Sequence, residues 1–258
     1  MEQIQSEIQN GILHIIFNRP EKKNALTSAM YETMVGLLQH AESDKAIRVI
    51  VLRGNGDSFT AGNDIEDFVA KPWKGKAVPP AEQFIRAVAF ATKPVIAAVH
   101  GLAVGIGTTI LLHCDLVYAA EDARFMTPFV NLGIIPEAGS TLLLPMQIGH
   151  RRASELLLLA APFAAQRAYE LGIVNSVVPG DQLFTTASTA AQTLVEKPAS
   201  AIRLAKQMMK EPLKAGLDRV IREEVLAIAG RLESPETAEA LRAFLEKRKP
   251  DFSRLPEM

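Results

Sequence analysis

Residues 95–107 read VIAAVHGLAVGIG and join a short, wholly apolar run to a glycine-rich segment. The apolar run at 95–99 is typical of a strand that is buried on both faces of a sheet. Apolar residues continue after the glycines, so we expect a buried helix over 105–112. A strand followed by a tight turn and a helix predicts an α/β architecture.

The same succession of short strands and helices continues on both sides of this stretch. Thr27 can cap a helix whose apolar residues include Met30, Met34 and Leu38. Residues 71–80 are rich in Lys, Pro and Gly and are expected to form a surface loop. The remaining strands are expected at 12–17, 48–52, 116–119 and 172–179, and the remaining helices at 81–91, 142–148, 153–159 and 164–171.

The composition changes after residue 195, where the strand signals stop. We therefore divide the chain into a core at 1–195 and a helical segment at 196–258. Within that segment, apolar residues at 217, 221, 225, 228 and 232 fall at helical spacing, so this face must pack against something. The spacing leaves open whether the face is a subunit interface or a contact within the chain. Helices are expected at 199–209, 213–232 and 235–247.

The 28 Lys and Arg residues nearly cancel the 29 Asp and Glu residues, so no large field of one sign is expected. That balance argues against a dedicated binder of nucleic acid or anionic membranes. The N-terminal residues are polar and no run of about 18 apolar residues occurs, so we expect a cytoplasmic protein without membrane contact. Cys114 lies in an apolar run and is expected to be an inert core thiol. The His residues are scattered, so no metal site is expected.

Two glycine-containing segments could stabilise an anion. Residues 59–65 read FTAGNDI, and small residues there allow a ligand to approach a free backbone N–H. The alternative is a tight turn in which Asp64 caps a helix. Residues 101–107 open a helix, whose N-terminal N–H groups and partial positive charge suit an oxyanion. A dinucleotide-binding turn competes here, but Ile110 stands where its third glycine is required.

A third segment, 127–140, reads TPFVNLGIIPEAGS and places one carboxylate, Glu137, after an apolar run. Apolar surroundings raise the pKa of a carboxylate and make it a base near neutral pH. The alternative is a glutamate favoured by the dipole at a helix N-terminus. Trp73 is a candidate for an acyl pocket, although surface aromatic residues are equally common.

Together with two flanking motifs, these segments resemble the crotonase (enoyl-CoA hydratase/isomerase) superfamily along nearly the whole chain. The motifs are NRPEKKNAL at 18–26, AGNDI at 61–65, GLAVGIG at 101–107 and ESPETAEALRAFLEKRKPDF at 233–252. The resemblance implies a spiral of ββα units and a C-terminal helical segment that builds homotrimers or hexamers. It also implies an acyl-CoA substrate and no separate cofactor, because coenzyme A is part of the substrate.

The resemblance further implies a site. The backbone N–H groups of Asn63 and Ile106 would form an oxyanion hole, and Glu137 would move the proton. Lys23 would lie near the CoA phosphates, and the other CoA-binding residues would be Ala25, Leu26, Ala61, Asp64 and Ile65. The acyl pocket would include Phe68, Trp73 and Phe129.

Two departures from the family pattern bear on the reaction. Family hydratases carry glutamates at two positions that hold Thr109 and Phe129 here, and neither of these residues can act as a general base. Glu137 falls where peroxisomal-type Δ3,Δ2-enoyl-CoA isomerases keep their single carboxylate. The sequence therefore predicts an isomerase that moves a 3-enoyl-CoA double bond to the 2-position. The alternatives are an enoyl-CoA hydratase or another CoA-thioester lyase or isomerase reaction, and a non-catalytic acyl-CoA-binding member of the fold.

Overall fold

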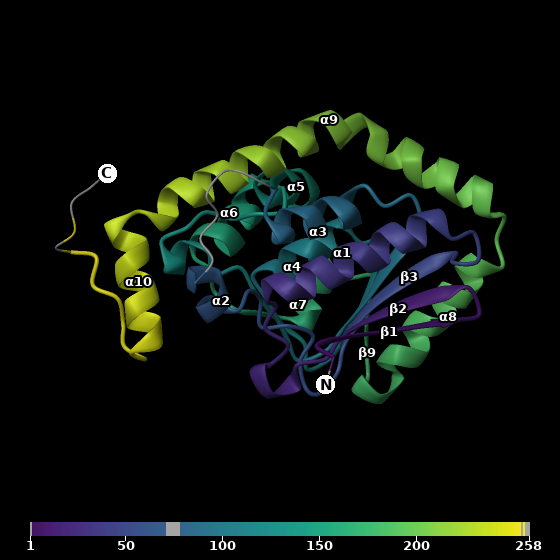
Figure 1. Cartoon of the computed structure of the whole chain (residues 1–258), viewed down its shortest axis with the longest axis horizontal. Helices are drawn as coiled ribbons and strands as arrows, with labels where there is room; N and C mark the ends of the chain where they lie inside the picture. The colour runs from purple at the N-terminus through teal and green to yellow at the C-terminus, as the bar shows by residue number, and fades with distance from the viewer. Residues whose placement is uncertain (1, 71–77, 254, 256–258) are drawn as a thin grey trace.

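A six-stranded sheet forms the centre of the molecule (Figure 1). The computed structural model describes residues 2–70, 78–253 and 255, and side chains except those of 68–70. The strand order is β1-β2-β3-β4-β6-β9, with β1 antiparallel to β2 and every other neighbouring pair parallel. The strands are β1 (Ile4–Gln9), β2 (Ile12–Phe17), β3 (Val49–Gly54), β4 (Val95–Val99), β6 (Leu116–Ala120) and β9 (Ser176–Val178).

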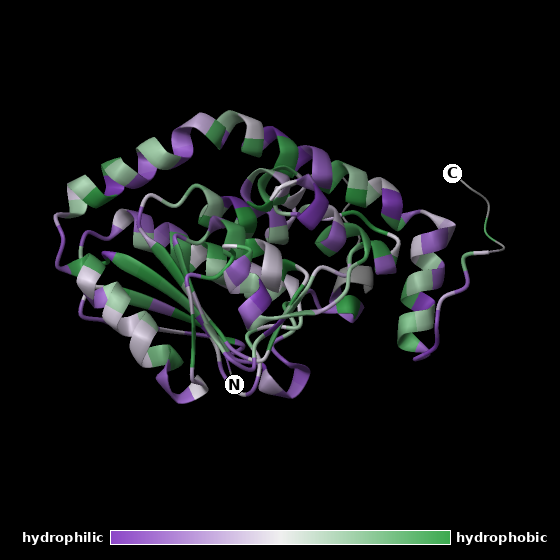
Figure 2. Ribbon diagram, turned by 180° about the vertical axis from the view of Figure 1, so that it is seen from behind, coloured by the Kyte–Doolittle hydropathy of each residue, from purple (hydrophilic) through white to green (hydrophobic). Residues whose placement is uncertain are grey.

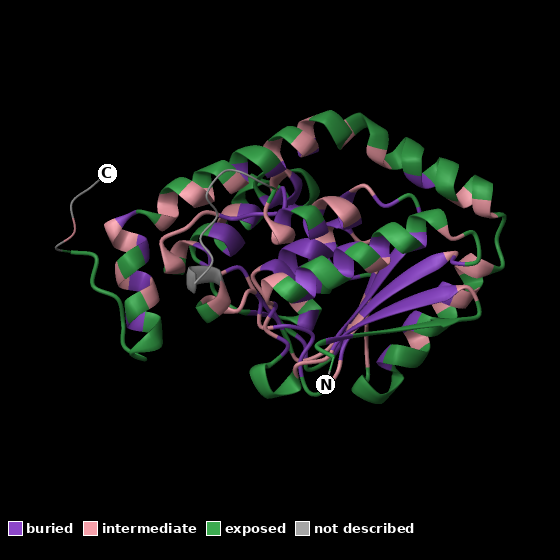
Figure 3. Cartoon of the chain, viewed as in Figure 1, coloured by how far each residue is buried: buried purple, intermediate pink, exposed green. Residues whose placement is uncertain are grey.

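Both faces of this sheet are covered, which explains why its central strands are apolar throughout. In β3, Val49 and Val51 pack with the helix α8 (Leu183–Val195) on one face. Ile50 and Leu52 point to the opposite face and join the larger core under α1 (Ser28–Ser43) and α3 (Pro80–Ala89). Figure 3 shows the central strands β2, β3 and β4 as mostly buried, and Figure 2 shows them among the most hydrophobic elements. The predicted α/β architecture is confirmed.

Strand–strand–helix units follow one another along the chain and set up the functional edge of the sheet. β4 is followed by β5 (Leu102–Val104) and α4 (Ile106–Thr109); β6 is followed by β7 (Arg124–Met126), η3 (Val130–Leu132) and α5 (Ser140–Ile148). β5 pairs with β7 in a second, three-stranded sheet, which β8 (Phe163–Ala164) completes. The expected ββα units are therefore present. The turn from β4 to β5 and the turn from β6 to β7 lie side by side.

Local signals fix several helix ends. The Thr27 hydroxyl accepts a hydrogen bond from the Met30 N–H at the start of α1, as its sequence predicts. The buried helix expected over 105–112 consists of α4 followed by a tighter 3-10 turn, η2 (Ile110–His113). The remaining helices are η1 (Pro20–Lys22), α2 (Ile65–Ala70), α6 (His150–Leu158), α7 (Ala165–Glu170) and η4 (Gly180–Gln182).

The C-terminal part is a helical arm, and one expectation about it is wrong. The segments predicted as separate helices at 199–209 and 213–232 form one helix, α9 (Ala199–Leu232), which continues through Pro212. Proline removes the hydrogen bond to Met208, but Met208 is exposed, so water can satisfy its carbonyl. Lys206 and Lys210, just before the proline, donate hydrogen bonds to the core and fix that part of the helix.

α9 arches over the core, and α10 (Pro235–Leu245) extends from its far end (Figure 1). Both helices carry long exposed stretches (Figure 3). None of the helices within the described ranges is long and apolar enough to span a bilayer.

Candidate active site

The turn between β5 and α4 presents an unpaired main-chain donor. Gly105 has a φ of 57° and precedes the first helical residue, Ile106. The Gly105 N–H donates to the Met126 carbonyl at 2.9 Å, which ties the turn to β7. The N–H of Ile106 has no carbonyl one turn before it to bond to, and within the described chain no acceptor lies in hydrogen-bonding reach. This N–H is therefore available to an incoming oxygen.

A second free donor lies on the neighbouring segment. The Leu26 N–H donates to the Gly62 carbonyl at 2.8 Å, and the Asp64 N–H donates to the Leu26 carbonyl at 2.9 Å. Asn63 lies between these bonds, and its own N–H has no acceptor among the residues that the structure describes. Gly62 has a φ of 89°, and a Cβ there would lie 2.7 Å from the Val104 carbonyl oxygen. Glycine thus allows the two donor segments to touch.

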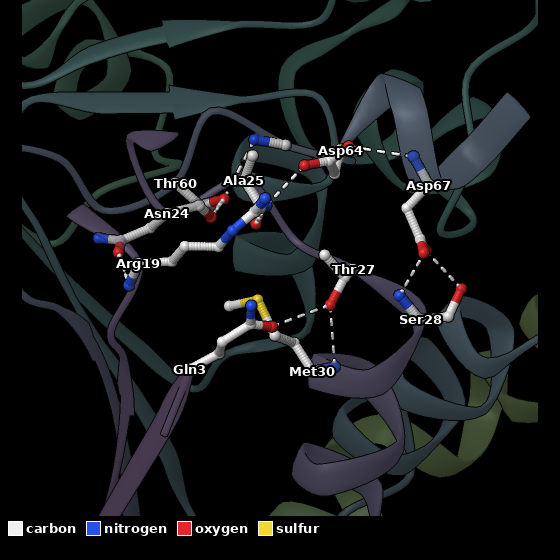
Figure 4. Close-up of polar contacts among 11 residues, drawn as sticks. Gln3, Arg19, Asn24, Ala25, Thr27, Ser28, Met30, Thr60, Asp64 and Asp67 are labelled. Carbon is white, nitrogen blue, oxygen red and sulfur yellow. Dashed lines mark hydrogen bonds and ion pairs between the residues drawn. The ribbon is translucent and has the colours of Figure 1, made fainter. Parts of the chain in front are cut away.

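Polar contacts from the N-terminal region hold the Asn63 segment in place (Figure 4). The Arg19 guanidinium donates to Asp64 Oδ2 at 2.5 Å and to the Ala25 carbonyl at 3.1 Å. Asp64 Oδ1 accepts from the Asp67 N–H at the start of α2, so Asp64 is also a helix cap. Asp67 Oδ2 in turn accepts from the Ser28 N–H and hydroxyl at the start of α1. Burial raises the pKa of Asp64, but the hydrogen bonds from Arg19 and the α2 backbone, together with the Arg19 charge, outweigh it, and the net shift is downward, so the carboxylate stays ionised.

Glu137 is a buried carboxyl, 6% exposed, in the loop before α5. Its Oε1 accepts a hydrogen bond from the Thr109 hydroxyl of α4 at 2.7 Å. Burial is the main reason that the pKa of Glu137 rises from 4.5 to about 8; the Thr109 hydrogen bond opposes this rise, and the charge of Glu224 adds to it. A carboxyl with this pKa can both take up and release a proton near neutral pH.

Two cavities meet at the donor segments. The wider one has a volume of about 570 Å³ and is lined by both Asn63 and Ile106. The narrower one, about 140 Å³, is mostly apolar and contains Glu137. Asn63, Asp64, Phe129 and Ile134 line both cavities, so the two adjoin at the Asn63 segment. A thioester oxygen at this junction would leave the neighbouring carbons facing the Glu137 cavity.

The other predicted site residues distribute between these cavities. Ala25, Ala61, Asp64 and Ile65 line the wider cavity, whereas Leu26 lines the narrower one. Lys23 lines neither: it forms an ion pair with exposed Asp57, and Lys22 contributes the lysine of the wider cavity. The Phe68 side chain and Trp73, together with most of the loop predicted at 71–80, lie outside the described residues.

Four residues contribute to the site in ways that the sequence does not predict. The Tyr31 hydroxyl donates to the side-chain oxygen of Asn63; burial is the main cause that raises its pKa well above the usual value, so the phenol stays protonated. Tyr31 lies on the apolar face of α1, where nothing in the sequence separates it from a core residue. Thr109 stood out only as a missing glutamate, not as a hydrogen-bond donor. Phe244 and Leu245 of α10 line the wider cavity.

The side chains that could bind a metal ion are scattered in the described part of the chain. Across residues 2–70, 78–253 and 255, no cluster of three or more His, Cys, Asp or Glu side chains is placed to hold a metal ion. Cys114 is partly buried, and burial is the main cause that raises its pKa to about 12, which keeps the thiol protonated and unreactive.

Comparison with known proteins agrees with this geometry. Residues 7–254 match the family model described as enoyl-CoA hydratase/isomerase. The chain is 36% identical to the 1,2-epoxyphenylacetyl-CoA isomerase of Escherichia coli K12, over 98% of this chain and 99% of the relative. It is 34% identical to enoyl-CoA delta isomerase 2 of Rattus norvegicus, over 93% of this chain and 62% of that protein.

Among solved structures, an enoyl-CoA hydratase/isomerase from Pseudoalteromonas atlantica T6c superposes with a TM-score of 0.93 at 35% identity, covering 98% of this chain and 100% of the other. The fold is therefore the crotonase fold with its C-terminal helical region. The chain belongs to the enoyl-CoA hydratase/isomerase family, whose members are enzymes that act on CoA thioesters.

Proposed function

We propose that this enzyme isomerises a 3-enoyl-CoA to the conjugated 2-enoyl-CoA. The observation that carries the proposal is a buried carboxyl, Glu137, with a pKa raised to about 8, in a mostly apolar cavity that is also lined by Asn63, whose N–H is free among the described residues. Thr109 and Phe129 occupy the positions at which family hydratases carry glutamates, so nothing there is suited to activate a water molecule. One proton carrier beside an oxyanion hole suits a reaction that moves one proton.

In the proposed mechanism, the thioester oxygen accepts hydrogen bonds from the N–H groups of Asn63 and Ile106. Ionised Glu137 removes a proton from C2, and the negative charge moves onto the thioester oxygen. The two N–H groups stabilise this dienolate; removing one such donor typically costs about 2.7–4 kcal/mol of transition-state stabilisation. Protonated Glu137 then returns the proton to C4, and the double bond becomes conjugated with the carbonyl.

We also propose that the chain acts as a homotrimer or hexamer built through its C-terminal helices. The support is the set of large apolar side chains exposed on α9 and α10, which a single chain leaves uncovered. They are Leu204, Met208, Met209, Leu226, Phe244 and Leu245. Light scattering on the purified protein would give the mass, and a monomer would contradict this part of the proposal.

A second candidate reaction is favoured by one comparison. The E. coli relative at 36% identity is named for isomerising 1,2-epoxyphenylacetyl-CoA. An oxyanion hole and one proton carrier also suit the rearrangement of a CoA thioester that bears an epoxide. The hydratase reaction is the third candidate, with Glu137 acting alone.

A substrate panel tests the proposal. Crotonyl-CoA hydration, 3-hexenoyl-CoA isomerisation and turnover of the epoxide are measured under one set of conditions, with ultraviolet absorbance and mass spectrometry. Isomerisation leaves the mass unchanged, whereas hydration adds one water. We expect 3-hexenoyl-CoA to give the highest kcat/KM. Faster hydration of crotonyl-CoA, or turnover of the epoxide alone, would overturn the proposal in favour of the corresponding candidate.

A further inference from the structure

The turn that carries Glu137 has an unusual backbone. Ala138 and Gly139, the two residues after it, have φ values of 60° and 68°. Such left-handed angles are unfavourable for alanine, so the surroundings must hold this turn in place. At Gly139, a Cβ would lie 2.3 Å from a methyl group of Leu217, which shows how closely α9 packs against the turn.

A carboxylate on α9 provides much of that restraint. Oε2 of Glu224 accepts from the Gly139 N–H at 2.6 Å, and Oε1 accepts from the Thr141 N–H at 3.1 Å and the Thr141 hydroxyl at 2.6 Å. Glu224 is 3% exposed. Its carboxylate therefore satisfies free N–H groups at the start of α5, where negative charge is also favoured by the helix dipole.

A second contact pins the turn from the opposite side. Nε2 of buried His113 lies 2.7 Å from the Ala138 carbonyl oxygen, so this nitrogen carries the proton and donates it. Burial is the main cause that lowers the pKa of His113 to about 4, so the ring is neutral near neutral pH. The peptide group between Ala138 and Gly139 is thus held at both ends by side chains from other elements, its C=O by His113 and its N–H by Glu224.

We infer that Glu224 is a positioning residue for the reaction: it fixes the turn that directs Glu137 at the substrate, and its negative charge disfavours a second negative charge on Glu137. This inference rests on the proposed role of Glu137 as the proton carrier. It also gives α9 a function beyond assembly, because the same helix supplies Val225, Ile228 and Leu232 to the wall of the Glu137 cavity.

The pH dependence of kcat/KM also depends on the titratable groups around Glu137 and its turn on the neighbouring helices and loops. Tyr31 of α1 and His113 of η2 are neutral, because burial raises the pKa of the tyrosine and lowers that of the histidine. The other acidic groups on the cavity wall are Asp64, Asp67 and Glu82. None of these groups is altered by a substitution at Glu224.

The test is Glu224→Gln, assayed for kcat, KM and the pH dependence of kcat/KM on 3-hexenoyl-CoA. The glutamine amide keeps the size of the side chain but turns one acceptor into a donor, so either Gly139 or Thr141 loses a partner. We expect kcat to fall between about tenfold and a hundredfold through misplacement of the base, with little change in KM. Burial raises the pKa of Glu224 itself, so its charge acts on Glu137 at pH values where Glu224 is ionised. In that range we expect the acidic limb of the profile to move to lower pH in Glu224→Gln, because a nearby negative charge has been removed.

The neighbouring Glu223 provides a matched control. It is exposed and pairs with Arg219 at 3.0 Å, so Glu223→Gln makes the same chemical change on the same helix without touching the turn. We expect its kcat and pH profile to equal those of the parent. If Glu224→Gln does not fold, Thr141→Val carries the same test, since it removes one hydroxyl donor and keeps the backbone N–H; kcat should then fall severalfold.

Glu137→Gln is assayed in parallel to separate the two ideas. An inactive Glu137→Gln together with a Glu224→Gln that matches Glu223→Gln in kcat and pH profile would refute the positioning role and leave the proposed base standing. A fall in kcat without movement of the acidic limb would refute the electrostatic half of the inference. Retained activity in Glu137→Gln would remove the proposed function, and this inference with it.

Discussion

Replacement of Glu137 by glutamine should change the pH dependence of stability as well as activity. Glutamine keeps the size of the side chain and an oxygen that can accept the Thr109 hydroxyl, but it has no charge to bury. The parent enzyme buries a carboxyl whose pKa rises from 4.5 to about 8, mainly because of that burial. The variant removes this dependence of stability on the protonation of residue 137 and leaves the packing of the cavity in place.

The sign and size follow from that shift. Because the pKa of Glu137 is higher in the folded than in the unfolded chain, proton binding stabilises the folded state. This contribution is fully present below about pH 4.5 and is lost as the pH rises through about 8. At about 1.4 kcal/mol per pKa unit, the whole loss is roughly 5 kcal/mol. Between about pH 5 and pH 9, the parent should therefore lose roughly 4 kcal/mol of unfolding free energy that Glu137→Gln does not lose.

Urea unfolding at several pH values, at one fixed protein concentration, measures this difference. Glu223→Gln is the control, because its side chain is exposed and its removal should change stability by no more than about 0.5 kcal/mol at any pH. Parallel stability curves for the parent and Glu137→Gln across this pH range would refute the claim that Glu137 is a buried carboxyl with a raised pKa.

Three further outcomes are expected. The kcat/KM for isomerisation should show an acidic limb near pH 8, because only ionised Glu137 can accept the C2 proton; a limb near pH 4.5 would mean that the working carboxyl is solvated. Thr109→Val should move that limb to higher pH, since the Thr109 hydrogen bond lowers the pKa of Glu137, and an unchanged limb in the same titration would contradict this contact. Tyr31→Phe should lower kcat roughly tenfold by releasing the Asn63 side chain, with the acidic limb unmoved; steady-state kinetics equal to the parent would show that this hydrogen bond does not support the oxyanion segment.

The parts of the fold that the sequence predicts are those whose signal is local. The runs at 12–17 and 95–99 coincide with β2 and β4, because a strand covered on both faces is apolar at nearly every position, with His14 the exception in β2. β1 has one buried residue, Ile4, and its polar composition hides an edge strand. Pro212 suggests a break because proline cannot donate a backbone hydrogen bond, yet side-chain anchors from α9 to the core keep the helix continuous.

The site residues likewise divide into those with a local signal in the sequence and those without one. The donor segments are visible because Gly62 permits a close approach that a Cβ would block, and Gly105 adopts a positive φ that favours glycine. Glu137 is visible as a carboxylate among apolar residues. Its partners are not, because Tyr31 and Glu224 reach the site from helices far away in sequence and look like ordinary helix residues. Contacts of this kind depend on the packing of α1 and α9, which no local pattern encodes.

The most direct measurement is the kcat of Glu137→Gln for the conversion of 3-hexenoyl-CoA to its conjugated isomer, followed by absorbance at saturating substrate. With folding verified by circular dichroism, we expect kcat to fall about a thousandfold, because the two backbone donors remain but the proton has no carrier. A kcat close to that of the parent would contradict the assignment of Glu137 as the base.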